Sequence, residues 1–138
     1  MGTRATIHIA KREEGVSFSE IPKKKLVSIY NQYDGYPEGL GVTIASYLDN
    51  KTIVNGIGVD RNTVFNGLGC LAASLIAELK EEAGNVYIDN PDCPHGWLDY
   101  EYVVWGNSGK GIWISIFDCY GNCIFVGKPS KLQNKYGE

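Results

Sequence analysis

The order of hydrophobic and polar positions predicts two strands at the start of the chain. Residues 3–10 alternate as a strand does, with Ile7 and Ile9 on one face and His8 on the other. A polar loop separates this run from residues 26–33, which form a second apolar run. We expect the two strands to pair in an antiparallel manner. His8 is expected to point toward solvent, because it alternates with residues that face the core.

Two later segments have the spacing of apolar residues that is typical of amphipathic helices. The first covers residues 40–49. The stronger pattern covers residues 67–83, and Gly84 is expected to end that helix. Its apolar face is formed by Leu68, Leu71, Ala72, Leu75, Ile76 and Leu79. Residues 50–61, between the two helices, contain Gly and Asn and are expected to form a loop.

The C-terminal half is rich in runs that are typical of strands. They cover residues 85–89, 97–105, 111–118 and 123–127. The last two are expected to form a hairpin that turns at residues 120–122, and residues 129–136 are expected to add one helical turn. Strands that bracket a helical pair predict an α+β fold of order β-β-α-α-β-β-β-β. Its sheet should be antiparallel or mixed, with two helices packed on one face.

The composition is that of one globular domain, which we expect to cover residues 1–138. The chain has 43% hydrophobic and 21% charged residues, both normal values for folded proteins. Its net charge of −3 argues against polymeric nucleic acid as a partner, because such binding needs basic residues that neutralise many phosphates. No apolar stretch approaches the roughly 18 residues of a membrane span, and no signal peptide is apparent. We therefore expect a soluble intracellular protein without a membrane partner.

One glycine motif invites comparison with dinucleotide-binding proteins. Residues 67–72 match the pattern G-x-G-x-x-A at a helix start, through Gly67 and Gly69, and Asp89 follows near the place of a ribose-binding acid. The preceding residues 62–66 are not the long apolar strand that such a site requires. Close packing of the helix on the sheet is the favoured interpretation. The free N–H groups of the first turn could nevertheless bind a phosphate.

The cysteines and histidines do not form a recognised metal motif. Cys93, His95, Cys119 and Cys123 could in principle bind zinc, but their spacings are not those of familiar zinc modules. We expect ordinary reduced cysteines and no bound metal or other cofactor, with zinc or a disulfide between Cys119 and Cys123 as alternatives. The segment 106–110 misses the nucleophile elbow G-x-S-x-G by one position. No catalytic residues are assigned, and we do not expect an enzyme.

Aromatic residues are concentrated in the predicted strands and in the turn over residues 33–39. Alternation implies that the aromatics of residues 97–105 cannot all face one core, so we expect part of this aromatic surface to be exposed or to lie in an interface. Cross-strand packing is the favoured interpretation of these aromatics, and a stacking platform or an oligomer interface is the functional alternative. Tyr36 lies at the apex of the turn with no strand neighbour to pack on. Its ring is therefore a candidate stacking surface for a ligand or partner.

Three motifs give the chain a resemblance to other proteins. They are residues 1–4 (MGTR), 33–39 (YDGYPEG) and 66–73 (NGLGCLAA). Over nearly its whole length, the chain resembles a widespread family of small phage and bacterial proteins that have these motifs in the same order. It is also similar to viral proteins that sequester cyclic-nucleotide immune signals and so evade CBASS defence. The resemblance implies a phage-encoded immune-evasion protein of the host cytoplasm, a homo-oligomer (dimer or tetramer) that binds a cyclic nucleotide or oligonucleotide without cleaving it.

The implied site combines aromatic stacking with phosphate binding. The expected ligand-binding residues are Arg4, Tyr33, Tyr36, Gly67, Gly69 and Trp97. Stacking contributes about 1–3 kcal/mol per base, whereas a nanomolar complex needs about 12 kcal/mol, so a preorganised symmetric interface would have to contribute the remainder. The alternative function is a non-enzymatic protein–protein inhibitor of a host defence enzyme, which fits the aromatic surface and the mild acidity equally well.

Overall fold

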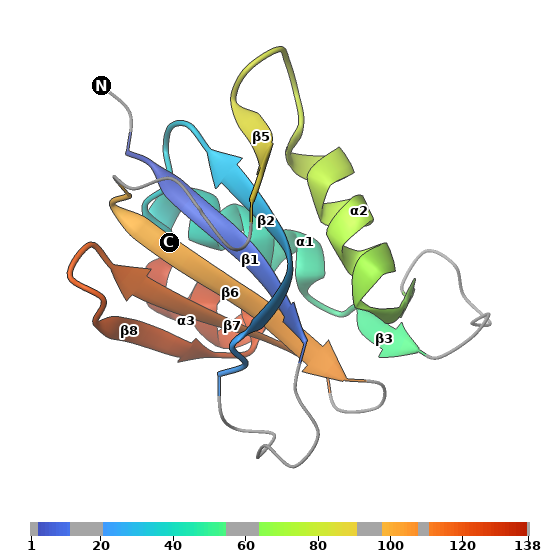
Figure 1. Cartoon of the computed structure of the whole chain (residues 1–138). Helices are drawn as coiled ribbons and strands as arrows, with labels where there is room; N and C mark the ends of the chain where they lie inside the picture. Colours follow the sequence, from blue (N-terminus) through green and yellow to red (C-terminus); the bar gives the residue numbers. More distant parts are fainter. Residues whose placement is uncertain (1–2, 12–20, 55–63, 91–97, 108–110, 138) are drawn as a thin grey trace.

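A six-stranded mixed sheet organises the chain and confirms the α+β class (Figure 1). The computed structural model describes residues 3–11, 21–54, 64–90, 98–107 and 111–137. The strands of the sheet are β1 (Ala5–Lys11), β2 (Lys24–Asn31), β5 (Val86–Asp89), β6 (Tyr100–Asn107), β7 (Gly111–Asp118) and β8 (Cys123–Gly127). They lie in the order β5-β2-β1-β6-β7-β8, which places the first strand of the chain at the centre.

The strand pairings explain why the sheet is mixed. β1 and β2 pair in an antiparallel manner, as predicted, with Ile7 opposite Ile29. On its other side β1 pairs in parallel with β6, where Ile7 lies opposite Tyr102. A parallel pair needs a crossover connection, and the helices between the two strands belong to it. The hairpin of β7 and β8 is confirmed.

Three helices pack on one face of the sheet, where two were predicted. They are α1 (Val42–Leu48), α2 (Gly67–Leu79) and α3 (Pro129–Tyr136). In the view of Figure 1, α1 and α3 lie behind the sheet. Helix and sheet residues share one core, which includes Ile7, Ile29, Ile114, Ile44, Leu48, Leu71, Leu75 and Leu132. The terminal segment forms a full helix rather than a single turn, because Leu132 packs into this core.

The predicted helix over residues 40–49 begins earlier and in a different geometry. A π-helical turn, η1 (Pro37–Gly41), precedes α1 directly. The N–H of Val42 donates to the carbonyl oxygen of Pro37, which is the i to i−5 bond of a π-turn. Pro37 at the first position of η1 is consistent with its fixed φ angle and missing donor.

The helix predicted over residues 67–83 ends at Leu79. The side-chain amide of Asn85 donates to the carbonyl oxygen of Leu79 at 3.1 Å, in a buried position. Asn85 has a left-handed backbone (φ 47°), which brings its amide back toward the helix end. Lys80 Nζ donates to the carbonyl oxygen of Gly84 at 2.6 Å. The side chains of Asn85 and Lys80 thus form hydrogen bonds at the end of the helix. The pattern of apolar residues does not predict such bonds.

The segment predicted as a loop over residues 50–61 contains a strand. β3 (Thr52–Val54) pairs in parallel with β4 (Val64–Asn66) in a separate two-stranded sheet. A dinucleotide-binding fold requires the strand before its glycine motif to lie in the main sheet. The strand that precedes α2 does not lie there. Close helix packing is also wrong as the reason for the glycines, because no described atom lies within 4 Å of a Cβ built on Gly67 or Gly69. Gly67 instead supplies a positive φ of 83°.

The prediction that His8 faces solvent is wrong. Alternation does place His8 opposite to Ile7 and Ile9, but the second face of the sheet is also buried around His8, which is fully inaccessible. Its Nε2–H donates to a carboxylate oxygen of Glu101 at 2.7 Å, and the Ser28 hydroxyl lies 2.6 Å from Nδ1.

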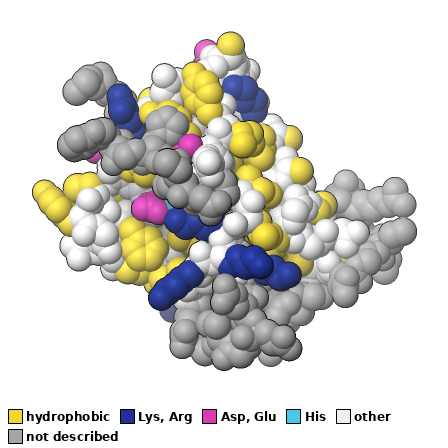
Figure 2. All heavy atoms as spheres, viewed as in Figure 1, with side chains coloured by type: hydrophobic (Ala, Val, Ile, Leu, Met, Phe, Trp, Pro, Cys, Tyr) yellow, Lys and Arg dark blue, Asp and Glu magenta, His cyan; other side chains and the backbone are white. Residues whose placement is uncertain are grey.

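Figure 2 shows the surface of the molecule in the view of Figure 1, with Lys and Arg side chains beside hydrophobic side chains on its described part.

Cross-strand packing, the favoured interpretation, accounts for the buried aromatic residues of β6. Tyr102 and Trp105 of β6 lie on opposite faces, and both are buried. Cross-strand packing is the better explanation here, because Trp105 stacks with Trp113 of β7 at a centroid distance of 6.4 Å. The exposed tyrosines of the described chain are Tyr33, Tyr36, Tyr87 and Tyr120.

In the part of the chain that the structure describes, no helix is long and apolar enough to cross a bilayer.

Candidate functional site

Hydrogen bonds join the turn over residues 33–39 to the beginning of β1. The N–H of Gly35 donates to the carbonyl oxygen of Thr3 at 2.9 Å, and the N–H of Leu40 donates to that of Asp34 at 3.2 Å. The buried hydroxyl of Tyr102 donates to the carbonyl oxygen of Gly35 at 2.7 Å. Burial raises the pKa of Tyr102 far above its ordinary value, so this hydroxyl remains a donor. The turn is therefore held by β1 and β6 together.

The glycines of the turn are required by close approach. A Cβ on Gly35 would lie 2.6 Å from the Cβ of Ala5, closer than two carbon atoms can pack. A Cβ on Gly39 would lie 3.0 Å from the ring of Tyr36, because that ring rests on Gly39. Tyr36 was expected to have no strand neighbour to pack on, and its ring contacts Gly39 of η1. One face of its ring contacts the start of η1, and the side chain remains partly exposed.

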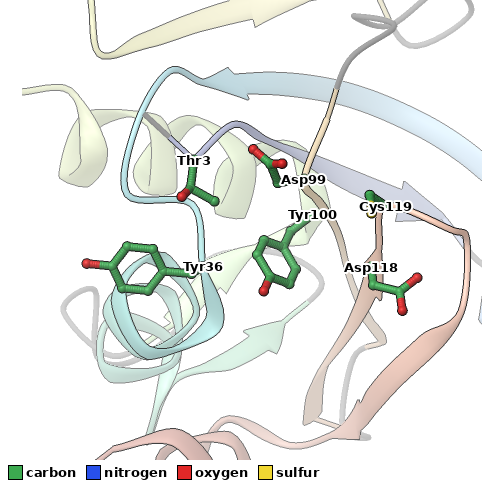
Figure 3. A pocket seen from close by; sticks show the side chains of 6 residues that line it. All are labelled: Thr3, Tyr36, Asp99, Tyr100, Asp118 and Cys119. Carbon is green, nitrogen blue, oxygen red and sulfur yellow. The ribbon is translucent and has the colours of Figure 1, made fainter. Parts of the chain in front are cut away.

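A pocket of about 270 Å³ lies beside Tyr36, where the first residues of β1 and β6 meet the end of β7 (Figure 3). Its described lining residues are Thr3, Tyr36, Asp99, Tyr100, Asp118 and Cys119. In Figure 3 the ring of Tyr100 points from β6 toward the turn, whereas the ring of Tyr36 extends from the turn away from Tyr100. The carboxylate of Asp99 lies on the side of Thr3, away from the Tyr100 ring, and that of Asp118 points away from both rings. The described lining thus combines two aromatic rings with two carboxylates.

Backbone N–H groups hold both carboxylates in place. Asp99 Oδ2 accepts from the N–H of Arg4 at 2.9 Å. Asp118 Oδ1 accepts from the N–H groups of Tyr120 and Asn122, at 3.0 and 2.9 Å, within the turn between β7 and β8. Asp118 is therefore committed to the turn, whereas Asp99 is oriented by one bond and has further lone pairs.

The electrostatic character of the pocket is negative. The pKa of Tyr100 is raised, first by burial and then by the charges of Glu38 and Asp99. None of the six described lining residues is cationic. A negative, partly desolvated surface favours ligands that donate hydrogen bonds and disfavours a phosphate inside the pocket. The volume lies just below the 300–1,000 Å³ of typical small-molecule pockets, so it suits one ring system rather than a whole dinucleotide.

The structure brings together only part of the predicted site. Tyr36 lines the pocket, and Arg4 adjoins it through its backbone, because its carbonyl oxygen accepts from the N–H of Asp99 at 2.9 Å. Tyr33 points elsewhere, and its hydroxyl donates to Glu82 after the end of α2 at 3.2 Å. Gly67 and Gly69 begin α2, which starts beside β3 at the far end of the molecule in Figure 1. Trp97 lies outside the described residues.

Five of the described lining residues were outside the predicted ligand-binding set: Thr3, Asp99, Tyr100, Asp118 and Cys119. Tyr100 was visible as an aromatic residue at the start of a strand, but its partner across the pocket was not. Asp99 and Asp118 are separated along the chain and meet because β6 and β7 are antiparallel, with Tyr100 opposite Asp118. A hairpin register could have suggested this pair. The contact with Tyr36 could not have been inferred in that way.

The metal and thiol alternatives are narrowed by the structure. Among the described residues, no group of three His, Cys, Asp or Glu side chains is placed to hold a metal ion. Cys93 and His95 lie outside the described residues, so zinc binding by them stays a hypothesis. Cys119 and Cys123 are free, exposed thiols rather than a disulfide.

Comparisons with protein-family models, curated proteins and solved structures found no match to this chain.

Proposed function

We propose that the protein binds a small nucleotide in this pocket, with Tyr36 and Tyr100 as the aromatic surfaces on which one base stacks. The observation that carries the proposal is that these two tyrosines and Asp99 line the same pocket. Stacking on aromatic side chains is worth about 1–3 kcal/mol per base and tolerates every base. A flat, amino-bearing ring matches the shape and the negative charge of this pocket better than a phosphate does.

The ligand is sequestered without being cleaved. Both carboxylates of the pocket already accept backbone N–H bonds, Asp99 from Arg4 and Asp118 from its own turn. The ribose and phosphates leave the pocket on its open side, and Arg4, whose backbone adjoins the pocket, is a candidate cation for them. The resemblance to cyclic-nucleotide sponges supports a cyclic nucleotide signal as the ligand class and immune evasion as the purpose of binding.

Calorimetric titration against a panel of cyclic mono- and dinucleotides tests the proposal. The unaltered protein is expected to bind at least one member with micromolar or better affinity. Tyr36→Ala should weaken that binding by about 5- to 150-fold, because it removes one stacking surface. Tyr87→Ala is the matched control, since Tyr87 is a similarly exposed ring on β5, outside the pocket. Absence of binding across the whole panel would overturn the proposal.

Cysteine alkylation can show that the ligand occupies this pocket. Cys119 lines it, whereas Cys70 is an exposed thiol in α2. Ligand should slow the alkylation of Cys119 and leave that of Cys70 unchanged, as followed by peptide mass spectrometry. Equal protection of both thiols would point to another site or to aggregation. Heat denaturation of the complex should then release the ligand chemically intact, and a hydrolysed product would contradict sequestration.

A protein–protein inhibitor is the second candidate function. Edge strand β5 exposes Ile88, which is 68% accessible, beside Tyr87. A contact with a host defence enzyme would bury these side chains. Pull-down from host lysate distinguishes the two functions. A stoichiometric protein that Tyr36→Ala retains and Ile88→Lys loses supports inhibition through β5, and recovery of a nucleotide alone supports sequestration.

A further inference from the structure

We propose that the pocket selects guanine, and that the carboxylate of Asp99 recognises its Watson–Crick edge. This inference rests on the proposed nucleotide-binding function and adds which base is bound. Guanine presents two adjacent donors on that edge, the N1–H and the N2 amino group. An ionised carboxylate can accept from both in parallel, in the way that it accepts a bidentate pair from arginine.

The hydrogen-bonding capacity of the pocket favours this geometry. A carboxylate has about four acceptor positions, and the N–H of Arg4 occupies one on Asp99. The bond to Arg4 fixes the orientation of the group before a ligand arrives. Asp118 contributes less, because its carboxylate points away from the two rings and is bonded to the N–H groups of Tyr120 and Asn122. Of the two carboxylates in the described lining, Asp99 is thus the one with more remaining acceptor capacity.

The other bases fit a carboxylate poorly. Adenine and cytosine each place a ring nitrogen with a lone pair beside the amino group, and that lone pair would face the negative oxygen. Uracil flanks its one N–H with two carbonyl oxygens. No Lys, Arg or His is among the described lining residues, so these acceptors find no cation there. Repulsion against the wrong base adds to the attraction for guanine, as specificity requires.

A titration of the unaltered protein with GMP, IMP and AMP tests the inference directly. The three probes carry the same ribose and phosphate, so their differences report the base alone. NMR chemical-shift titration suits the millimolar affinities that one base can give. GMP should bind about 5- to 150-fold more tightly than AMP, the range expected for a bidentate pair. IMP should be intermediate, because it keeps N1–H and lacks the N2 amino group.

Asp99→Asn then tests the role of the carboxylate. Asparagine keeps one oxygen for the N–H of Arg4 and loses the second acceptor, so the preference for GMP over AMP should fall close to one. Glu38→Gln is the matched control. It removes a charge that acts on Tyr100 but lies outside the pocket lining, and the GMP to AMP ratio should not change. Circular dichroism of both variants checks that the fold is kept.

The possible outcomes separate the two proposals. Binding of GMP with the expected ratio, abolished by Asp99→Asn, supports guanine selection. Equal binding of GMP and AMP, or a preference for AMP, overturns it and leaves nucleotide binding standing. If Asp99→Asn fails to fold, the comparison of GMP with IMP on the unaltered protein still decides, because equal affinities contradict recognition of the N2 amino group. If no nucleotide binds in either experiment, both proposals fall.

Discussion

Single residues in the turn show how sequence restricts the site. Gly35 lies where the turn meets β1, with room for a hydrogen atom only, and its carbonyl oxygen accepts the hydroxyl of Tyr102. Gly39 leaves space for the ring of Tyr36. The two glycines, Gly35 and Gly39, therefore have different structural roles. Gly35 lets the turn pack against the sheet, and Gly39 sets where the pocket ring lies.

Gly35→Ala should destabilise the protein by about 1–3 kcal/mol, the usual cost of overpacking. The new methyl group would meet Ala5 and the carbonyl oxygen of Thr3, neither of which is a flexible side chain. Urea unfolding measures the effect. Gly69→Ala is the control, because it lies in the first turn of α2 with open space around it. The control should be neutral or stabilising by up to about 1 kcal/mol.

Glu101 gives a prediction of pH dependence. Its hydrogen bond with His8 is the largest cause of its lowered pKa, with smaller help from the charges of His8 and Lys25. A carboxyl group whose pKa is lower in the folded state stabilises the protein above its unfolded pKa of about 4.3. That contribution is lost as the pH falls through the folded pKa.

Urea unfolding of the unaltered protein and of Glu101→Gln, from pH 7 to pH 3, tests this sign. The unaltered protein should be the more stable at pH 7, by on the order of 1 kcal/mol for a part-exposed bond. The gap should narrow below about pH 4.5, where the carboxyl group is protonated first in the unfolded state, and should close as the pH falls through the lower folded-state pKa of Glu101. Parallel pH profiles would show that the bond to His8 contributes nothing.

At the scale of elements, the course of the backbone from β2 to α1 determines whether Tyr33 or Tyr36 lines the pocket. Tyr33 and Tyr36 are three positions apart and equally exposed, at 39% each. Tyr33 reaches toward Glu82, beyond the end of α2, whereas Tyr36 lines the same pocket as Tyr100 of β6. The left-handed backbone of Asp34, between them, separates their directions.

Comparison of Tyr33→Ala with Tyr36→Ala tests this assignment. Both variants remove a part-exposed ring, so their stabilities should differ little. Only Tyr36→Ala should weaken nucleotide binding in calorimetry. The sequence alone predicts that both rings contact the ligand. Equal loss in the two variants would therefore favour that prediction over the pocket seen in the structure.

The end of α2 gives a second prediction at this scale. Asn85→Gly keeps a residue suited to positive φ but removes the buried amide that bonds to Leu79. It should destabilise the protein by about 0.5–1.5 kcal/mol, the net value of a hydrogen bond. Asn50→Gly, at another positive φ but exposed, should be near neutral. Thermal unfolding of both variants measures the difference, and equal shifts would assign the effect to the backbone alone.

At the scale of the whole molecule, pocket size bears on assembly. A volume of about 270 Å³ suits one base, whereas a cyclic dinucleotide has two. Two copies related by a two-fold axis would hold one base each. Calorimetry with cyclic di-GMP should therefore give one ligand per two chains, and sedimentation velocity should show a dimer in its presence. A ratio of one ligand per chain would contradict shared binding.

The pattern of apolar positions determined much of this fold by itself. The strands over 111–118 and 123–127, their hairpin and the start of α2 at Gly67 follow from local periodicity and turn residues, and the structure confirms them. The same holds for the antiparallel pairing of β1 with β2. Such signals lie within a few residues of one another, so the sequence contains them directly.

Tertiary structure alone decided which surfaces meet. Alternation assigned His8 to the face opposite Ile7, but it could not report that this second face is buried too. The parallel pairing of β1 with β6 is likewise absent from any local pattern. That pairing carries Asp99 and Tyr100 to the turn that holds Tyr36, and so creates the pocket. The sequence thus determined the elements and the turn, whereas contacts between distant residues, which depend on the packing of the whole chain, decided the site.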